Sequence, residues 1–307
     1  MDLTISGANQ QYLADLQTVQ DQINQAQSQL SSGYRLQQAS DDPSAISEIY
    51  DLQTQIAFNQ QTQTNLGGAQ TELSAADTAL QSSIQAVESA ISIASQGASS
   101  TSTAANQANL ATEAQGLQQT LVSLSQTQAN GSYIFSGDQS TQPSYALDPT
   151  APDGVQQLLT ATNTRVIQDV NGTSIATART ATQIFDAQDS SGNPVSGNVF
   201  AAINSLITSL QSNNQAGIAA AADSLNAAGQ YLNGQLAFYG ETENRVSAAT
   251  QLAQQFLVQD QTSLGQVQDA DVPSAALTLT QAQTQQQAAL SVEAKIQQEP
   301  NLFSLLA

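Results

Sequence analysis

The feature that most constrains the fold is a seven-residue spacing of apolar residues near the N-terminal end of the chain. Near the N-terminus, Leu16, Ile23 and Leu30 are seven residues apart. The alternate positions of the same repeat are Tyr12, Val19, Ala26 and Gly33. Two columns offset in this way form the seam of a coiled coil. The spacing therefore predicts a helix that packs one narrow face against another helix.

Composition excludes several classes of function. The 307 residues include no Cys and no His, and they carry 25 acidic against 5 basic residues, a net charge of −20. Without Cys or His there is no disulfide, thiol nucleophile, ordinary zinc site or histidine general base. Serine is abundant, but without His or an adjacent Lys no Ser can be assigned as an activated nucleophile. We therefore expect no enzyme, no cofactor and no metal centre.

The few basic residues also argue against two kinds of partner. Nucleic acids and anionic membrane surfaces are bound by clustered Lys and Arg, which this chain lacks. No stretch reaches the ~18 to 20 consecutive apolar residues of a membrane helix. The first residues show no basic and apolar segments of a cleavable secretory signal. We expect neither nucleic-acid binding nor membrane insertion.

The remaining composition suits thin helical structure. Charged residues make up 10% and aromatic residues 5%, while glutamine alone accounts for 50 residues. Such a chain has few large side chains for a broad core, and low hydrophobicity with high net charge can also indicate disorder. The sustained periodicity favours narrow helix–helix seams instead.

Two further heptad segments predict long helices. One column holds Leu66, Leu73, Leu80 and Val87, and another holds Ile218, Leu225, Leu232, Tyr239, Val246 and Ala253. A Ser/Thr/Ala-rich turn at 97–105 leads into a third helix that we expect to end near residue 130. Helix then returns near Asn198. Gly67-Gly68, inside the first long helix, is either a hinge or a packing defect.

Between these helices the composition changes. Proline concentrates between residues 140 and 195, and Tyr133-Ile134-Phe135 is typical of a short strand. Segments 165–170 and 173–178 flank Asn171-Gly172, the strongest short hairpin signal. Residues 131–198 are therefore predicted to form a small β-containing insert.

The layout is nearly palindromic. We expect a mainly α protein, a long antiparallel coiled-coil or helical-bundle rod built from both chain ends, with a small β-containing insert. The predicted domains are a terminal coiled-coil domain (1–42 plus 270–307), a helical rod domain (43–130 plus 199–269) and the outer insert (131–198).

Acidic motifs allow more than one interpretation. Asp41-Asp42-Pro43 could be an acid/base pair or a cation site, but it is explained by helix capping, with Pro43 at the first helical position. The acidic residues of the insert lack the spacing of a calcium-binding loop, so a solvated surface is favoured.

The terminal heptads pose the main functional question. The two ends can simply pair within one chain. Thin helices with Gln- and Ala-interrupted seams are also marginal in water, which favours ends that are loose in the monomer and ordered by assembly. The apolar tail Leu302-Phe303-Ser304-Leu305-Leu306 is either buried core or a patch for a partner, and we favour the patch.

Specific strings then point to a family. Leu30-Ser31-Ser32-Gly33-Tyr34-Arg35-Leu36, followed by Ala39-Ser40-Asp41-Asp42-Pro43, resembles the N-terminal signature of bacterial flagellins and their hook–filament junction relatives. Asp269–Pro273, Leu279–Ala282 and the tail 302–306 are similar to the flagellin C-terminus. Tyr133–Gly137 and the short insert look more like the junction subgroup than like filament flagellin.

The resemblance implies a structural, non-catalytic subunit of the extracellular bacterial flagellum that connects hook to filament. Such proteins leave the cell unfolded through the flagellar type III export channel, without a cleaved signal. The implied partners are copies of itself in a ring, a neighbouring hook-associated protein, flagellin, and an export chaperone at the C-terminal segment.

Residue roles follow from the same resemblance. The implied subunit-interface residues are Leu16, Ile23, Leu30, Leu279, Leu290, Ile296, Leu302, Phe303, Leu305 and Leu306. The implied inter-domain elbow consists of Ser31, Ser32, Gly33, Arg35, Asp41, Asp42 and Pro43.

Three other functions remain open at this point. A filament flagellin would polymerise as pure protein. A cytoplasmic coiled-coil adaptor would never appear outside the cell. A secreted adhesin-like rod would bind a surface and leave motility unaffected.

Overall fold

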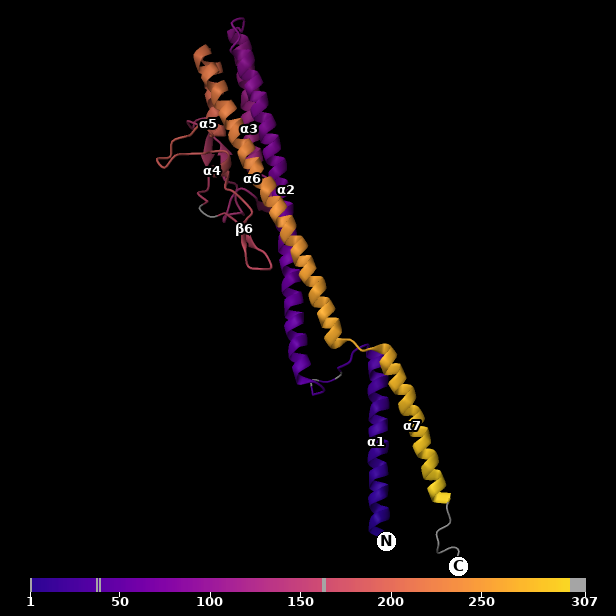
Figure 1. Ribbon diagram of the computed structural model, residues 1–307. Helices are drawn as coiled ribbons and strands as arrows, with labels where there is room; N and C mark the ends of the chain where they lie inside the picture. Colours follow the sequence, from indigo (N-terminus) through magenta and orange to yellow (C-terminus); the bar gives the residue numbers. More distant parts are fainter. Residues whose placement is uncertain (1, 37, 39, 162–163, 299–307) are drawn as a thin grey trace, which may run out of the picture. The chain divides into compact units, whose positions relative to one another are not determined.

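The computed structural model in Figure 1 describes residues 2–36, 38, 40–161 and 164–298, with side chains between residues 10 and 295 of these ranges. The predicted C-terminal patch (302–306) and the stop at Pro300 lie outside the described residues. The chain divides into two compact units. We call residues 1–58 plus 256–307 the terminal unit and residues 59–255 the central unit.

Helices dominate both units. The described chain contains α1 (Asp2–Ser32), α2 (Pro43–Gly97), α3 (Ala104–Ser125), α4 (Ala181–Ile184), α5 (Val199–Gln211), α6 (Gln215–Gln268) and α7 (Val272–Gln298). With only small two-stranded sheets besides, the mainly α fold with a β-containing insert is confirmed. No helix in the described ranges has both the length and the apolarity that a membrane crossing needs.

The heptad columns of the long helices form the core of the central unit. On α2, Leu66, Leu73, Leu80 and Val87 are fully buried, and so are Ile218, Leu225, Leu232, Val246 and Ala253 on α6. The two helices run antiparallel in this unit, since Gln63 donates to Gln254 and Ser74 to Glu243. Figure 1 shows α2 and α6 side by side here. Helix α3 adds Leu121 and Val122, and α5 adds Ile203 and Leu206, to the same core.

Some predicted helix boundaries were wrong. Helix α3 ends at Ser125, five residues before the expected end, because the chain turns into a β-hairpin there. The helix expected from residue 198 onward is broken at 212–214, where Asn213 has a positive φ of 52° and Asn214 caps α6 by accepting from the N–H of Gly217. By contrast, Gly67-Gly68 lies within an unbroken α2.

The insert consists of three separate antiparallel pairs. They are β1 (Gln128–Ala129) with β2 (Ser132–Tyr133), β3 (Tyr145–Leu147) with β4 (Val155–Gln157), and β5 (Val166–Gln168) with β6 (Ser174–Ala176). The hairpin around Asn171-Gly172 is confirmed, with shorter strands and a wider loop than expected. The Asp169 carboxylate shapes that loop by accepting from the backbone N–H groups of Asn171 and Thr173.

The expected strand at 133–135 covers only its first residue. Ile134 and Phe135 lie in a turn, and both are buried against the helices. The Phe135 ring meets Phe185 and Tyr239 edge-on, at centroid distances of 5.7 and 6.4 Å. Burial raises the pKa of Tyr239 to about 12. The aromatic residues here serve packing, not strand pairing.

Two arginines fasten the insert to the long helices of the central unit. Arg165 donates to the Glu72 carboxylate on α2 at 2.9 Å and to the carbonyl of Ile134. Arg179 donates to Gln235 on α6, and its guanidinium lies 4.1 Å from the centre of the Phe238 ring. Insert and helices therefore share one core and one set of polar ties.

Candidate functional site: the terminal helix pair and its elbow

The terminal unit is built around the antiparallel pair of α1 and α7, which lie side by side in Figure 1. Tyr12 donates to Glu293 at 3.2 Å and Gln286 to Gln20 at 2.7 Å, so the start of α1 faces the end of α7. The α1 residues that repeat every seven positions lie on the side of the helix that faces α7. The α1 positions that are buried or half-buried include Tyr12, Leu16, Val19, Ile23, Ala26 and Leu30, and Gly33 directly after the helix is half-buried as well.

On α7 the shielded positions repeat with the same heptad. They are Ala275, Leu279, Ala282, Gln286, Ala289 and Glu293. Alanine, glutamine and glutamate occupy most of them, so this seam buries few large apolar groups. Dense packing of large side chains is what stabilises such a seam. The two terminal helices thus pair through a regular heptad seam that contains few large apolar side chains.

The residues expected at a subunit interface occupy different places in this pair. Ile23 is buried, while Leu16, Leu30 and Leu279 are half-buried along the seam. Leu290 lies one position beyond the seam and is 49% exposed. Ile296 belongs to α7, but its side chain is not among those described.

The elbow begins where α1 stops. Gly33 closes the helix with its N–H on the carbonyl of Gln29 and adopts φ +77°, the left-handed conformation in which glycine carries no steric penalty. The hydroxyl groups of Ser31 and Ser32 turn back to the carbonyl of Ser28. The sequence therefore ends this helix with a residue that also redirects the chain.

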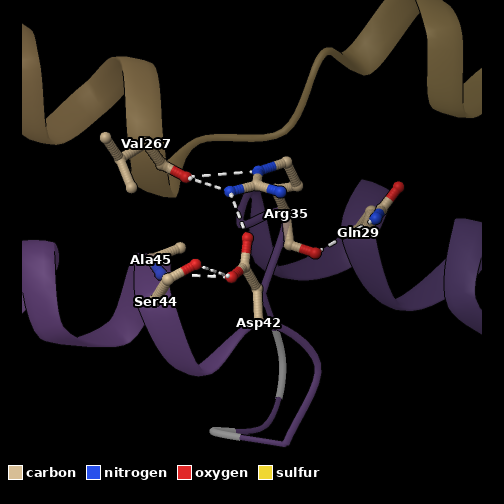
Figure 2. A network of polar contacts seen from close by, with 6 residues as sticks. All are labelled: Gln29, Arg35, Asp42, Ser44, Ala45 and Val267. Atoms are coloured by element: carbon tan, nitrogen blue, oxygen red, sulfur yellow. Dashed lines mark hydrogen bonds and ion pairs between the residues drawn. The ribbon is translucent and has the colours of Figure 1, made fainter.

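Arg35, in the segment between α1 and α2, contacts the end of α6, as Figure 2 shows. Its guanidinium donates twice to the carbonyl of Val267, at 3.1 and 3.2 Å, and its backbone N–H donates to the carbonyl of Gln268. The side chain of Gln29 donates in turn to the carbonyl of Arg35. A cation at a helix C-terminus is favourable because the terminal carbonyls carry partial negative charge.

Asp42 performs the matching task at the start of α2. Its carboxylate accepts from the Ser44 hydroxyl at 2.7 Å and from the backbone N–H of Ala45 at 3.1 Å, and Pro43 is the first helical residue. These hydrogen bonds, with a smaller contribution from Arg35, lower the pKa of Asp42. The Arg35–Asp42 ion pair spans 3.9 Å between half-exposed side chains, so solvent screening leaves it weak. Asp41 instead accepts from the N–H of Gln38.

The segment between α6 and α7 (269–271) is held to the segment between α1 and α2 (33–42) by backbone hydrogen bonds. The N–H of Ala270 donates to the carbonyl of Gly33 at 2.8 Å, and Tyr34 pairs with Asp269 as a short antiparallel bridge. Asp271 then caps α7 by accepting from the N–H of Ser274. Sequence reasoning missed Val267, Gln268 and Ala270, because they act through backbone groups that every residue type carries.

Exposed apolar side chains are distributed unevenly over the described residues. Nine of the thirteen large ones lie in the terminal unit: Leu13, Tyr34, Tyr50, Phe58, Val258, Val272, Leu277, Leu290 and Val292. The other four lie in the insert, and none lies on the helices of the central unit. The terminal unit therefore exposes more of the large apolar side chains than the rest of the described chain.

Comparison with known proteins places this architecture. A Vibrio parahaemolyticus protein assigned as a flagellar hook-associated protein is 21% identical, with a TM-score of 0.64 over 75% of this chain and 100% of that one. The flagellar junction protein FlgL from Legionella pneumophila is 14% identical, with a TM-score of 0.55 over 72% and 99% of the two chains. FlgL from Xanthomonas campestris is also 14% identical, with a TM-score of 0.58 over 68% and 98%.

The sequence itself carries a family match. Residues 6–140 match the model of the bacterial flagellin N-terminal helical region. The N-terminal part of the chain is therefore similar to flagellins in sequence, and the fold is similar to that of FlgL. No curated protein matches the chain significantly in sequence. The matched segment includes α1, the elbow, α2 and α3, so the family pattern covers the first half of the site described above.

Proposed function

We propose that this protein is a structural junction subunit of the bacterial flagellum, which connects hook to filament through assembly of its terminal helices. The observation that supports the proposal is the unequal surface of the two units, in a chain whose residues 6–140 match the flagellin N-terminal region. The terminal helices have a thin seam and exposed apolar groups, whereas the helices of the central unit expose none of the large apolar side chains described. A flagellin-type end of this kind is suited to burial against neighbouring subunits.

The free energy for assembly would come from covering those groups. Each large apolar side chain buried contributes roughly 1.5 to 3 kcal/mol, against ~1 to 2 kcal/mol for each residue that must be ordered. The net stabilising free energy is small for one helix pair and increases when several copies bury each other's apolar side chains. We infer that the subunits form a ring next to a hook-associated protein on one side and flagellin on the other.

The remaining proposals concern the route and the residue roles. We propose export through the flagellar channel without a cleaved signal, with a chaperone at the C-terminal segment. The interface and elbow residues named from the family resemblance, and the three-domain division 1–42/270–307, 43–130/199–269 and 131–198, stay predictions of the same kind.

A clean deletion of the gene tests the junction role. We expect hooks without filaments by electron microscopy, and unpolymerised flagellin in the culture medium. Re-expression of the full chain should restore filaments, whereas a chain lacking residues 302–307 should not be incorporated. Incorporation of that truncated chain at the normal level would contradict assembly through the ends.

Two other outcomes of the deletion would overturn the proposal. Loss of filaments with no flagellin in the medium would make this chain the filament subunit itself. Normal flagella and normal motility would favour a coiled-coil adaptor or a secreted adhesin-like rod.

A further inference from the structure

One face of α2 in the terminal unit carries an exposed aromatic row. Tyr50 is 66% exposed and Phe58 is 55% exposed, with Thr54 between them. Residues four apart on a helix lie next to each other on one face. The opposite face of the same turns is buried, through Ala45 and Ile49. The row therefore points away from the side on which α2 packs.

The middle position of the row, Thr54, has its hydroxyl group bonded within the helix. The hydroxyl of Thr54 donates to the carbonyl of Tyr50 at 2.8 Å, one turn back. Its hydroxyl group is thus satisfied within the helix, so Thr54 adds no unpaired donor between the two aromatic positions. Tyr50, Thr54 and Phe58 follow one another at four-residue intervals on α2, and we call these three residues the aromatic row.

Acidic side chains border this row. Asp51 precedes Thr54 by three residues and Phe58 by seven, so it lies beside both on the helix surface. Glu48 is one turn before Asp51, and both residues are exposed. Among the described residues the ion pairs are Arg35–Asp42 and Arg165–Glu72, so neither of these two carboxylates has a cation.

Aromatic rings next to carboxylates suit a guanidinium, which stacks on a ring and donates to a carboxylate at the same time. The structure contains a related arrangement, in which a guanidinium stacks on a ring and donates to an amide oxygen in place of a carboxylate. The Arg179 guanidinium lies over the Phe238 ring, 4.1 Å from its centre, while it donates to Gln235. The aromatic row offers the same chemistry on the surface.

A second copy of the chain is poorly suited to supply that cation. The chain has five basic residues, and Arg35, Arg165 and Arg179 already make contacts within it. The terminal unit carries 12 acidic residues against Arg35 and Lys295, a net charge of −10, so the terminal unit of a second copy brings no net positive charge to the row. Charge complementarity favours a different, basic protein.

We propose that the aromatic row, with Glu48 and Asp51 beside it, docks an arginine-bearing segment of a protein other than this chain. The proposal rests on the junction role, in which such a subunit touches unlike neighbours, and it identifies the chemistry of one of them. Arginine side chains stack on Tyr50 and Phe58, and their outer N–H groups pair with Asp51.

The test uses the full chain and a fluorescein-labelled peptide of repeated Ala-Ala-Arg, with binding followed by fluorescence anisotropy. The double variant Tyr50→Ser/Phe58→Ser keeps every charge. We expect it to raise the Kd roughly five- to thirtyfold, as two exposed cation–π contacts imply. The matched control Leu158→Ser/Val166→Ser removes two exposed apolar groups from the insert and should leave the Kd unchanged. A Lys-containing peptide should discriminate less between variants than the Arg-containing one.

Two results would overturn the proposal. Equal peptide affinity for the wild type and the aromatic-row variant would mean that only the overall negative charge attracts the peptide. Reduced self-association of that variant in sedimentation experiments, with peptide binding unchanged, would make a second copy the occupant. The gene deletion reports on the junction role independently, since its outcome does not depend on which side chains dock a neighbour.

Discussion

The terminal and central units share a heptad repeat but differ in how completely the residues of that repeat are buried. In the central unit the repeat positions hold Leu and Val, and these side chains are fully buried. In the terminal unit the repeat is equally regular, but many positions hold Ala, Gln or Glu, and large apolar groups remain outside the seam. Periodicity decides where a helix packs, while the size of the residues at those positions decides whether one chain is enough to stabilise it.

The largest expected effect is the difference in local stability between the two units. In the monomer, amides of α1 and α7 should exchange with solvent orders of magnitude faster than those of α2 and α6 within 60–97 and 215–253. Exchange by local opening scales with the local free energy, which a thin seam keeps low. Hydrogen exchange with mass spectrometry measures this directly. Equal protection in both units would remove the basis of the comparison.

A matched pair of core substitutions should sharpen the same contrast. Leu225→Ala removes a fully buried side chain from α6 and is expected to lower the free energy of unfolding by about 2 to 5 kcal/mol. Leu279→Ala, in the half-buried seam of α7, should change the main transition of the monomer by less than about 0.5 kcal/mol. Urea unfolding followed by circular dichroism compares the two. Similar losses would show that the ends contribute to the cooperative unit.

The elbow predicts a smaller effect. Gly33 adopts φ +77° in open surroundings, so Gly33→Ala meets no neighbouring atom and its cost is the backbone strain alone, about 1 kcal/mol. We expect faster exchange at the end of α1 and at Ala270, with the central unit unchanged. Gly33→Asn is the control, because asparagine tolerates this conformation better and should retain more of the protection.

The smallest effect concerns pH. The Asp42 pKa is lowered in the folded state by its bonds to Ser44 and Ala45, so its contribution is present above the unfolded pKa and is lost as pH falls through the folded pKa. Acid should therefore loosen the start of α2 first at this cap. Carbon-detected NMR titration of the Asp42 carboxyl group follows it, with Asp42→Asn, which still caps a helix, as the pH-insensitive control. A titration at or above the ordinary aspartate value would contradict the cap.

The sequence was most informative where one side chain performs one task. The buried columns of α2 and α6, the cap at Asp42 and the hairpin near Asn171-Gly172 all follow from residue type and spacing. The mainly α class followed from them, and the family match agrees with the strings around Gly33 and Asp42.

The failures share a physical cause. Val267 and Ala270 hold the elbow through backbone groups, and such groups leave no trace in residue identity. Phe135 looked like a strand residue because aromatic residues favour strands, but tertiary packing placed it in a turn. The break at Asn213-Asn214 was missed because the heptad repeat begins only at Ile218 and contains no information about the two residues of turn-favouring type before it.

The hydrogen bond from Tyr12 to Glu293 joins residues 281 positions apart, and it has a consequence for the order of events. During synthesis, or on emergence from a narrow passage, the first end of the chain has no partner until almost the last residues arrive. A fragment cut short by premature termination therefore cannot present the paired ends. A partner that binds the paired helices would therefore bind only chains that contain both α1 and α7.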